Sequence, residues 1–184
     1  KGLRAGEYLI LTKPLGTGVL ATALKAKWEG SGDIETILYK WASRLNKVPG
    51  KAIREFEITG ATDITGFGLG GHLLEMIGGS KVRIELWLEE IPFIEEALDL
   101  AAMGMLPAGS FANKKYCGAM VELAQGLDDI KVDLAFDAQT SGGMLMGVPE
   151  DKVDAVCDML LEGGDMAVKI GRVFSAEGKQ GKLI

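Results

Sequence analysis

Histidine and cysteine are scarce in this sequence. Its 184 residues include one histidine, His72, and two cysteines, Cys117 and Cys157, which lie far apart and form no CxxC pair. So few sulfur and imidazole groups argue against a zinc site, and a disulfide framework is not needed. Ser-His or Cys-His catalysis would have to use His72. We expect a protein of a reducing compartment, the cytoplasm.

Long apolar runs and an excess of basic charge are also missing. No run approaches the roughly 18 uninterrupted apolar residues of a membrane-spanning helix, so we expect no membrane partner. The chain has 20 Lys and Arg against 26 Asp and Glu, a net charge of −6, which argues against a nucleic-acid partner. The first residues include neither an initiator Met nor an apolar leader, and we therefore expect a fragment of a longer protein.

The composition is that of a folded domain. Hydrophobic residues make up 47% of the chain, and the length suits one domain covering residues 1–184. The 26 glycines fall in clusters between segments with helical and strand-like patterns, as tight turns require. This alternation predicts an α/β fold in which helices pack on a single mixed sheet.

Apolar periodicity places the elements along the chain. Residues 81–88 alternate strictly between apolar and polar side chains, which predicts a half-buried strand. Further strand-like or apolar segments are 7–12, 57–65, 133–137, 143–148 and 168–173, the third and fourth flanking a polar turn. Helices are expected at 17–28, 33–45, 52–56, 72–77, 92–103, near 116 and at 153–161, with a loop at 107–113.

The most informative segment is residues 60–72. Thr62, Asp63 and Thr65 precede a run of glycines that opens a predicted helix. Glycine-turn and helix N-terminal N–H groups favour anions, and a carboxylate can hold a hard cation such as Mg²⁺ that bridges to phosphate oxygens. This pattern is typical of a phosphate and metal site. The alternative is that Asp63 only caps or tightens the turn.

The same glycines permit a second interpretation. Gly66, Gly68 and Gly71 satisfy GxGxxG, and Glu85 follows at about the 20-residue spacing of a dinucleotide-binding acid. The polar residues before Gly66 weaken this match, because the fingerprint requires an apolar strand there. A non-catalytic dinucleotide-binding module therefore remains an alternative.

Other polar residues have no assigned role at this level. His72 is expected to pack or to cap a helix. The segment 109–113 is either a substrate loop or an ordinary turn, and the segment 137–143 is open in the same way. Whether Asn113, Asp137 or Gln139 contacts a ligand is left undecided.

Three segments together resemble the selenophosphate synthetase (selenide, water dikinase) family. They are residues 9–18 (LILTKPLGTG), 61–73 (ATDITGFGLGGHL) and 137–143 (DAQTSGG). The resemblance extends over essentially the whole chain and corresponds to the C-terminal half of the family. It implies the C-terminal α/β fold of the aminoimidazole ribonucleotide synthetase-like (PurM-like) group, with an N-terminal ATP-binding domain absent from this chain.

The resemblance also implies a reaction and its parts. The family makes selenophosphate, AMP and orthophosphate from ATP, selenide and water, with Mg²⁺ holding the polyphosphate. Its motif aspartate maps onto Asp63 as a metal ligand, and Thr62, Thr65, Gly66 and Gly68 would shape the cofactor-binding turn. The catalytic Cys or selenocysteine lies upstream, so we expect no catalytic residue here and no activity from the isolated chain. The full-length enzyme is expected to be a homodimer. Another ATP-using enzyme of the same group is the nearest alternative.

Two positions depart from the family pattern. Ala138 stands where Pro is usual, and Gly70 stands where Leu is usual. The first is expected to loosen the turn and the second to loosen the following helix. Neither removes a ligand.

Overall fold

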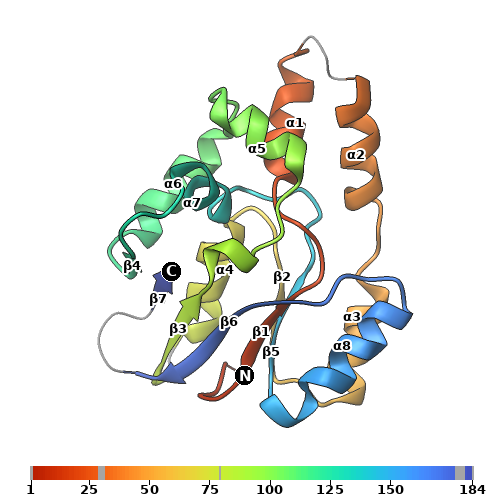
Figure 1. Ribbon diagram of the computed structural model, residues 1–184, viewed down its shortest axis with the longest axis vertical. Coiled ribbons are helices and arrows are strands. Elements are labelled where there is room, and N and C mark those ends of the chain that lie inside the picture. Colours follow the sequence, from red (N-terminus) through yellow and green to blue (C-terminus); the bar gives the residue numbers. More distant parts are fainter. Residues whose placement is uncertain (1, 29–31, 79, 177–180, 184) are drawn as a thin grey trace.

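The computed structural model describes residues 2–28, 32–78, 80–176 and 181–183. The strands within these ranges form one sheet in the order β2-β5-β1-β6-β3-β7-β4 (Figure 1). From β2 to β3 all neighbours are antiparallel, whereas β7 runs parallel to β3 and β4. The strands are β1 (Tyr8–Leu11), β2 (Gly60–Asp63), β3 (Val82–Leu86), β4 (Val121–Leu123), β5 (Met144–Val148), β6 (Val168–Ser175) and β7 (Gly181–Leu183).

Helices surround this sheet in three groups. Figure 1 shows α1, α2 and α5 together beyond one end of the central strands, α6 and α7 beside α4, and α3 paired with α8. The α-helices are α1 (Thr17–Lys25), α2 (Gly32–Ala42), α3 (Lys47–Glu55), α4 (Gly68–Ile77), α5 (Glu95–Ala102), α6 (Ala108–Cys117), α7 (Asp129–Ala135) and α8 (Val153–Glu162), and the 3₁₀ helices are η1 (Leu88–Glu90) and η2 (Glu150–Lys152). The predicted mixed α/β architecture is confirmed. None of the described helices is long and apolar enough to cross a membrane.

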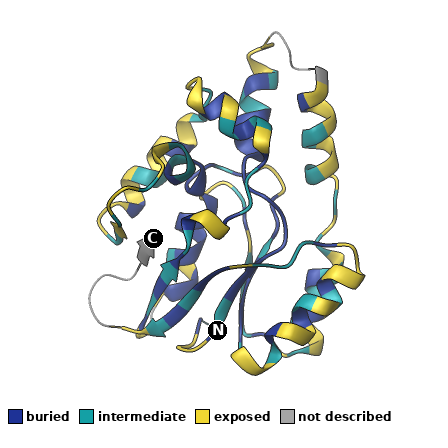
Figure 2. Ribbon diagram, viewed as in Figure 1, coloured by how far each residue is buried: buried dark blue, intermediate teal, exposed yellow. Residues whose placement is uncertain are grey.

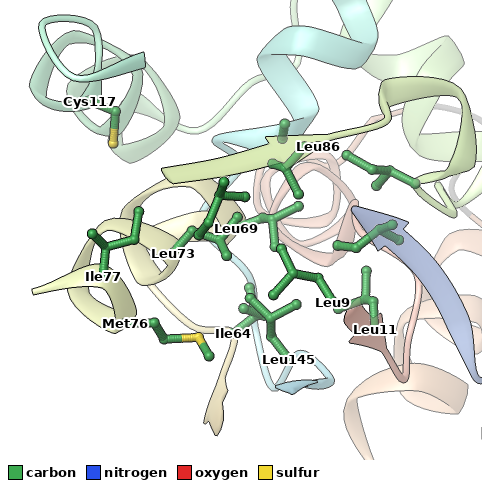
Figure 3. Close-up of a cluster of buried hydrophobic side chains, with 14 of the residues drawn as sticks. Leu9, Leu11, Ile64, Leu69, Leu73, Met76, Ile77, Leu86, Cys117 and Leu145 are labelled. Atoms are coloured by element: carbon green, nitrogen blue, oxygen red, sulfur yellow. The ribbon is translucent and has the colours of Figure 1, made fainter. Parts of the chain in front are cut away.

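The central strand β1 is buried on both faces. Leu9 and Leu11 enter the cluster that α4 covers, where Leu69 meets Ile64 and neighbouring side chains (Figure 3). Ile10 points to the other face and joins the cluster formed with α3 and α8. Strands covered on both faces become near-continuous apolar runs, which explains the unbroken sequence of β1. Figure 2 shows the corresponding dark centre, with the exposed residues mainly on the outer faces of the helices and on the loops.

The prediction for residues 81–88 is confirmed in its essentials. Val82, Ile84 and Leu86 of β3 are buried, and Arg83 and Glu85 between them are half-buried. Leu88 is also buried but belongs to η1.

Several local predictions are wrong. The expected loop at 107–113 lies mostly in α6, which begins just after Pro107, a residue compatible with a helix start because it needs no N–H partner there. Segment 133–137, expected to be strand-like, is not a strand, because residues 129–135 form helix α7, in whose first turn Ile130 N and Lys131 N donate to Asp128 Oδ1 at 2.8 and 3.1 Å. The helix expected at 52–56 begins earlier, because α3 starts at Lys47 and includes Pro49 in its first turn.

Other boundaries also differ from expectation. The second helix ends at Ala42, so Leu45, 78% exposed, is not part of its apolar face. Helix α4 begins at Gly68, four residues before the predicted start, and α5 begins at Glu95, after Pro92. The short edge strand β4 has too weak a pattern to be predicted.

Candidate phosphate and metal site

Asp63 is the last residue of the edge strand β2. Its backbone pairs with Met144 of β5, and its side chain is exposed. The next residue, Ile64, is fully buried and exchanges backbone hydrogen bonds with Gly143 (2.9 Å) and Gly142 (3.1 Å). The end of the strand is therefore anchored to residues 142–143 by two backbone hydrogen bonds, and the carboxylate extends from a fixed position.

The loop after Asp63 is held by two other segments of the chain. Thr65 O accepts hydrogen bonds from Gln139 N and Gly68 N, both at 3.0 Å. Gly66 O accepts a hydrogen bond from Asn113 Nδ2 at 2.9 Å. Gly68 has φ +66°, and a Cβ there would lie 2.7 Å from Phe136 O. Glycine is required at this position because the backbone is left-handed and because residues 136–137 lie against it.

The predicted site residues lie close together in sequence, at the end of β2, on the loop after it and at the start of α4. Thr62 is half-buried, its hydroxyl lying 3.3 Å from Asp63 O, while Gly66 is exposed and Gly68 is buried at the start of α4. Among the described residues no group of three or more His, Cys, Asp or Glu side chains could enclose a metal ion. As an oxygen ligand Asp63 fits a hard cation such as Mg²⁺, but this part of the chain offers one carboxylate and not a complete shell.

Asp137 lies beneath this loop and is fully buried. Its Oδ2 accepts hydrogen bonds from Gly18 N (3.1 Å) and Val19 N (3.3 Å) in the first turn of α1, and its Oδ1 accepts one from Ser110 Oγ (3.0 Å). Burial raises the pKa of Asp137 to about 6, although hydrogen bonds from Ser110, Gln139 and the α1 backbone oppose that rise. The carboxylate thus fills an anion position at a helix N-terminus.

Gln139 extends the same buried network. Its Oε1 accepts hydrogen bonds from Gly16 N (3.0 Å), Thr17 N (3.2 Å) and Thr17 Oγ1 (3.0 Å). Its Nε2 donates to Asp137 Oδ2 at 2.8 Å and to Asp137 O at 3.0 Å. The side chains of Asp137 and Gln139 are therefore engaged inside the protein, where they tie segment 16–19 to segment 137–140.

Lys13 is a buried cation that sequence reasoning did not single out. Its side chain is among the largest fully buried ones, and Nζ donates to the backbone oxygens of Trp41 (3.1 Å), Arg44 (2.6 Å) and Ser141 (2.9 Å). Burial lowers the pKa of Lys13, an effect that Asp165 opposes. A cation there complements the C-terminal end of α2 and links it to the 137–143 segment.

The sheet topology argues against the dinucleotide-binding alternative. In that fold the acid follows a strand parallel to and beside the strand of the glycine turn. Here Glu85 lies on β3, which is separated from β2 by β5, β1 and β6. Its carboxylate also lies 3.8 Å from Arg83.

Comparison with curated proteins gives close relatives of one kind. The chain is 52% identical over 173 residues to a selenide, water dikinase of Nitratidesulfovibrio vulgaris strain Miyazaki F, covering 94% of this chain and 49% of that protein. It is 42% identical over 179 residues to selenide, water dikinase 2 of Peptoclostridium acidaminophilum, covering 97% and 51%. The chain thus spans about half the length of these relatives, and it matches their C-terminal half.

Solved structures share the fold at low sequence identity. The thiamine-monophosphate kinase of Stenotrophomonas maltophilia superposes with a TM-score of 0.66 at 18% identity, covering all of this chain and 51% of that one. The hydrogenase maturation protein HypE in complex with ATP gives a TM-score of 0.64 at 21% identity, covering 97% and 45%. The family model for the C-terminal domain of AIR synthase related proteins matches residues 4–184, and the chain therefore belongs to that family.

Proposed function

We propose that residues 1–184 are the single C-terminal domain of a selenide, water dikinase, an enzyme that makes selenophosphate, AMP and orthophosphate from ATP, selenide and water. The observation that carries the proposal is the similarity of nearly the whole chain to such enzymes. It is supported by the arrangement of the 9–18, 61–73 and 137–143 segments, which are joined by buried hydrogen bonds around one loop. In this proposal the N-terminal half supplies the ATP-binding domain and the homodimer contacts.

Asp63 is the proposed metal ligand of this domain. Phosphoryl transfer depends mainly on positioning and on neutralising charge over the phosphate oxygens, and Mg²⁺ supplies that neutralisation when bound. Asp63 would contribute one carboxylate oxygen, and the N-terminal half would contribute the others. Thr62, Thr65, Gly66 and Gly68 would hold the loop so that Asp63 and the N–H groups of the turn face the polyphosphate.

The nucleophile is proposed to lie outside this chain. Cys117 is fully buried, and burial raises the pKa of its thiol, which disfavours the reactive thiolate. Cys157 is half-buried, and its pKa is raised by the same cause. Neither residue suits attack on a phosphate, in keeping with an upstream Cys or selenocysteine.

The test uses the full-length enzyme, assayed anaerobically with Mg-ATP and selenide by phosphorus NMR. Wild type is compared with Asp63→Ala and with Asp154→Ala, whose carboxylate is 97% exposed on α8. We expect selenophosphate and AMP from wild type and from the Asp154 variant, and loss of both products in the Asp63 variant. A wild type that forms no selenophosphate would refute the function. Full activity in Asp63→Ala would reduce Asp63 to a turn residue.

A further inference from the structure

His72 bridges the candidate loop and the helix that follows it. Its Nε2 lies 3.1 Å from Thr65 N and 3.0 Å from Thr65 Oγ1. Its Nδ1 lies 3.0 Å from Glu75 Oε2, one turn further along α4. His72 is 6% exposed, and its ring packs edge-on against Phe67, with the ring centroids 5.7 Å apart.

These contacts select one tautomer of the ring. A backbone N–H can only donate, so Nε2 must be the unprotonated nitrogen that accepts from Thr65 N. The remaining proton of a neutral imidazole then resides on Nδ1, where it donates to the Glu75 carboxylate. The hydrogen bonds therefore form one series, which runs from the exposed Glu75 carboxylate through His72 to Thr65 of the loop.

This series of hydrogen bonds ends at Thr65, which belongs to the candidate site. Thr65 is two residues after Asp63, and its carbonyl is held by Gln139 N and Gly68 N. With His72 on its N–H and Gln139 on its carbonyl, the Thr65 peptide is fixed from opposite directions. No other acceptor for Thr65 N is present among the described residues.

From this geometry we infer that His72 is a positioning residue for the Asp63–Gly68 loop, acting as a neutral acceptor oriented by Glu75. The inference rests on the proposed function for its link to Mg²⁺ and phosphate. Groups that orient a metal ligand from behind typically change metal affinity or activity by about 10- to 100-fold when they are removed. His72 therefore affects how firmly Asp63 is held in position to bind the metal, and it takes no part in the reaction itself.

The first test is independent of activity. Residues 1–184 contain a single histidine, and in the untagged full-length enzyme at neutral pH the imidazole ¹⁵N signals of this ring are identified as those that His72→Phe loses. We expect a pyridine-type Nε2 and a protonated Nδ1, together with a Thr65 amide proton that exchanges slowly. A protonated Nε2, or a Thr65 amide that exchanges as fast in wild type as in His72→Phe, would overturn the inference even if the enzyme makes selenophosphate.

The second test separates positioning from stability in the full-length enzyme. His72→Phe keeps a ring beside Phe67 but removes the acceptor, whereas His72→Gln keeps an amide oxygen near the place of Nε2. We expect the Mg²⁺ concentration for half-maximal activity to rise about 10-fold or more in the Phe variant and to recover largely in the Gln variant.

Val156→Ala serves as the matched control, because Val156 is fully buried in the separate cluster of α8. It should lower the melting temperature while leaving the Mg²⁺ requirement unchanged. A folded His72→Phe enzyme with a normal Mg²⁺ requirement would refute the positioning role. A wild type without selenophosphate synthesis would instead refute the proposed function and leave the NMR result to decide the role of His72 in the loop.

Discussion

The α-carbon of Gly70 lies directly against the aromatic ring of Phe136. A Cβ at position 70 would be 2.7 Å from Phe136 Cδ1 and closer still to Cε1. Phe136 is 3% exposed, so its ring occupies the space where a side chain at position 70 would point. Gly70 on α4 and Phe136 just after α7 therefore pack as a complementary pair. Gly70 leaves room for the Phe136 ring and does not simply loosen its helix.

Gly70→Ala should consequently destabilise the protein. Alanine favours a helix over glycine by about 1 kcal/mol, but overpacking against a buried ring costs about 1–3 kcal/mol. Urea unfolding of Gly70→Ala, Phe136→Leu and the double variant measures the coupling, which we expect to be favourable by about 0.5–3 kcal/mol. Additive effects of the two substitutions would contradict this relationship.

Asp137 should make stability depend on pH in a defined window. Its folded-state pKa of about 6 is above the ordinary value of 3.8, so the folded protein binds the proton more tightly than the unfolded chain. The stability from this group is fully present below about pH 4 and is lost as pH rises through 6. The loss by pH 7 is on the order of 3 kcal/mol.

Asp137→Asn checks this prediction, because the amide can donate to Ser110 while its oxygen accepts from α1. The difference in unfolding free energy between wild type and the variant should shift in favour of the variant between pH 4 and pH 7. A difference that stays constant across this range would show that Asp137 does not titrate there.

Lys13→Met should destabilise the protein by about 2–4 kcal/mol, because it retains much of the side-chain volume but leaves three backbone oxygens without their charged donor. Lys51→Met is the control, since Lys51 is 65% exposed on α3, and it should change stability by less than about 0.5 kcal/mol. Thermal unfolding of both variants compares them directly. Equal melting temperatures would mean that the Lys13 contacts contribute nothing net.

Gly18→Ala should disturb the buried network from the α1 side. A Cβ there would lie 2.6 Å from Asp137 Oδ1 and closer to Ala138 O, and moving these atoms would disturb the hydrogen bonds from Ser110 to Asp137 and from Gln139 N to Thr65 O. We expect a loss of stability of about 1–3 kcal/mol and a changed amide chemical shift for Val19. Gly50→Ala is the matched control, because a Cβ at Gly50 meets nothing within 4 Å.

Local sequence patterns predicted those strands and loops whose structure is determined mainly by neighbouring residues. The alternation of Val82, Ile84 and Leu86 specified β3, and the Asp63 to Gly68 spacing identified the β2–α4 loop. The helix after Pro107 was missed because Gly109, Ser110 and Asn113 have the composition of a turn, and α6 is defined by packing on α4 and α7.

The buried polar network could not have been predicted in this way. Gln139 meets Gly16 and Thr17 across more than 120 residues of sequence, and Lys13 reaches Ser141 across a similar separation. No periodicity records such pairs, because each depends on the sheet first bringing β1 beside β5. In the sequence these residues stand out only as parts of motifs, and their contacts are defined by the folded structure.

The position of β1 has a consequence for how the chain folds. It is the first strand in sequence, yet both of its neighbours, β5 and β6, lie in the last quarter of the chain. During synthesis β1 therefore has neither of its neighbouring strands until residues 144–175 have left the ribosome, and both of its hydrogen-bonding edges stay unpaired until then. Long-range pairing of this kind slows folding, so we expect the centre of the sheet to form late and in one cooperative step, with β1 exposed to chaperones until then.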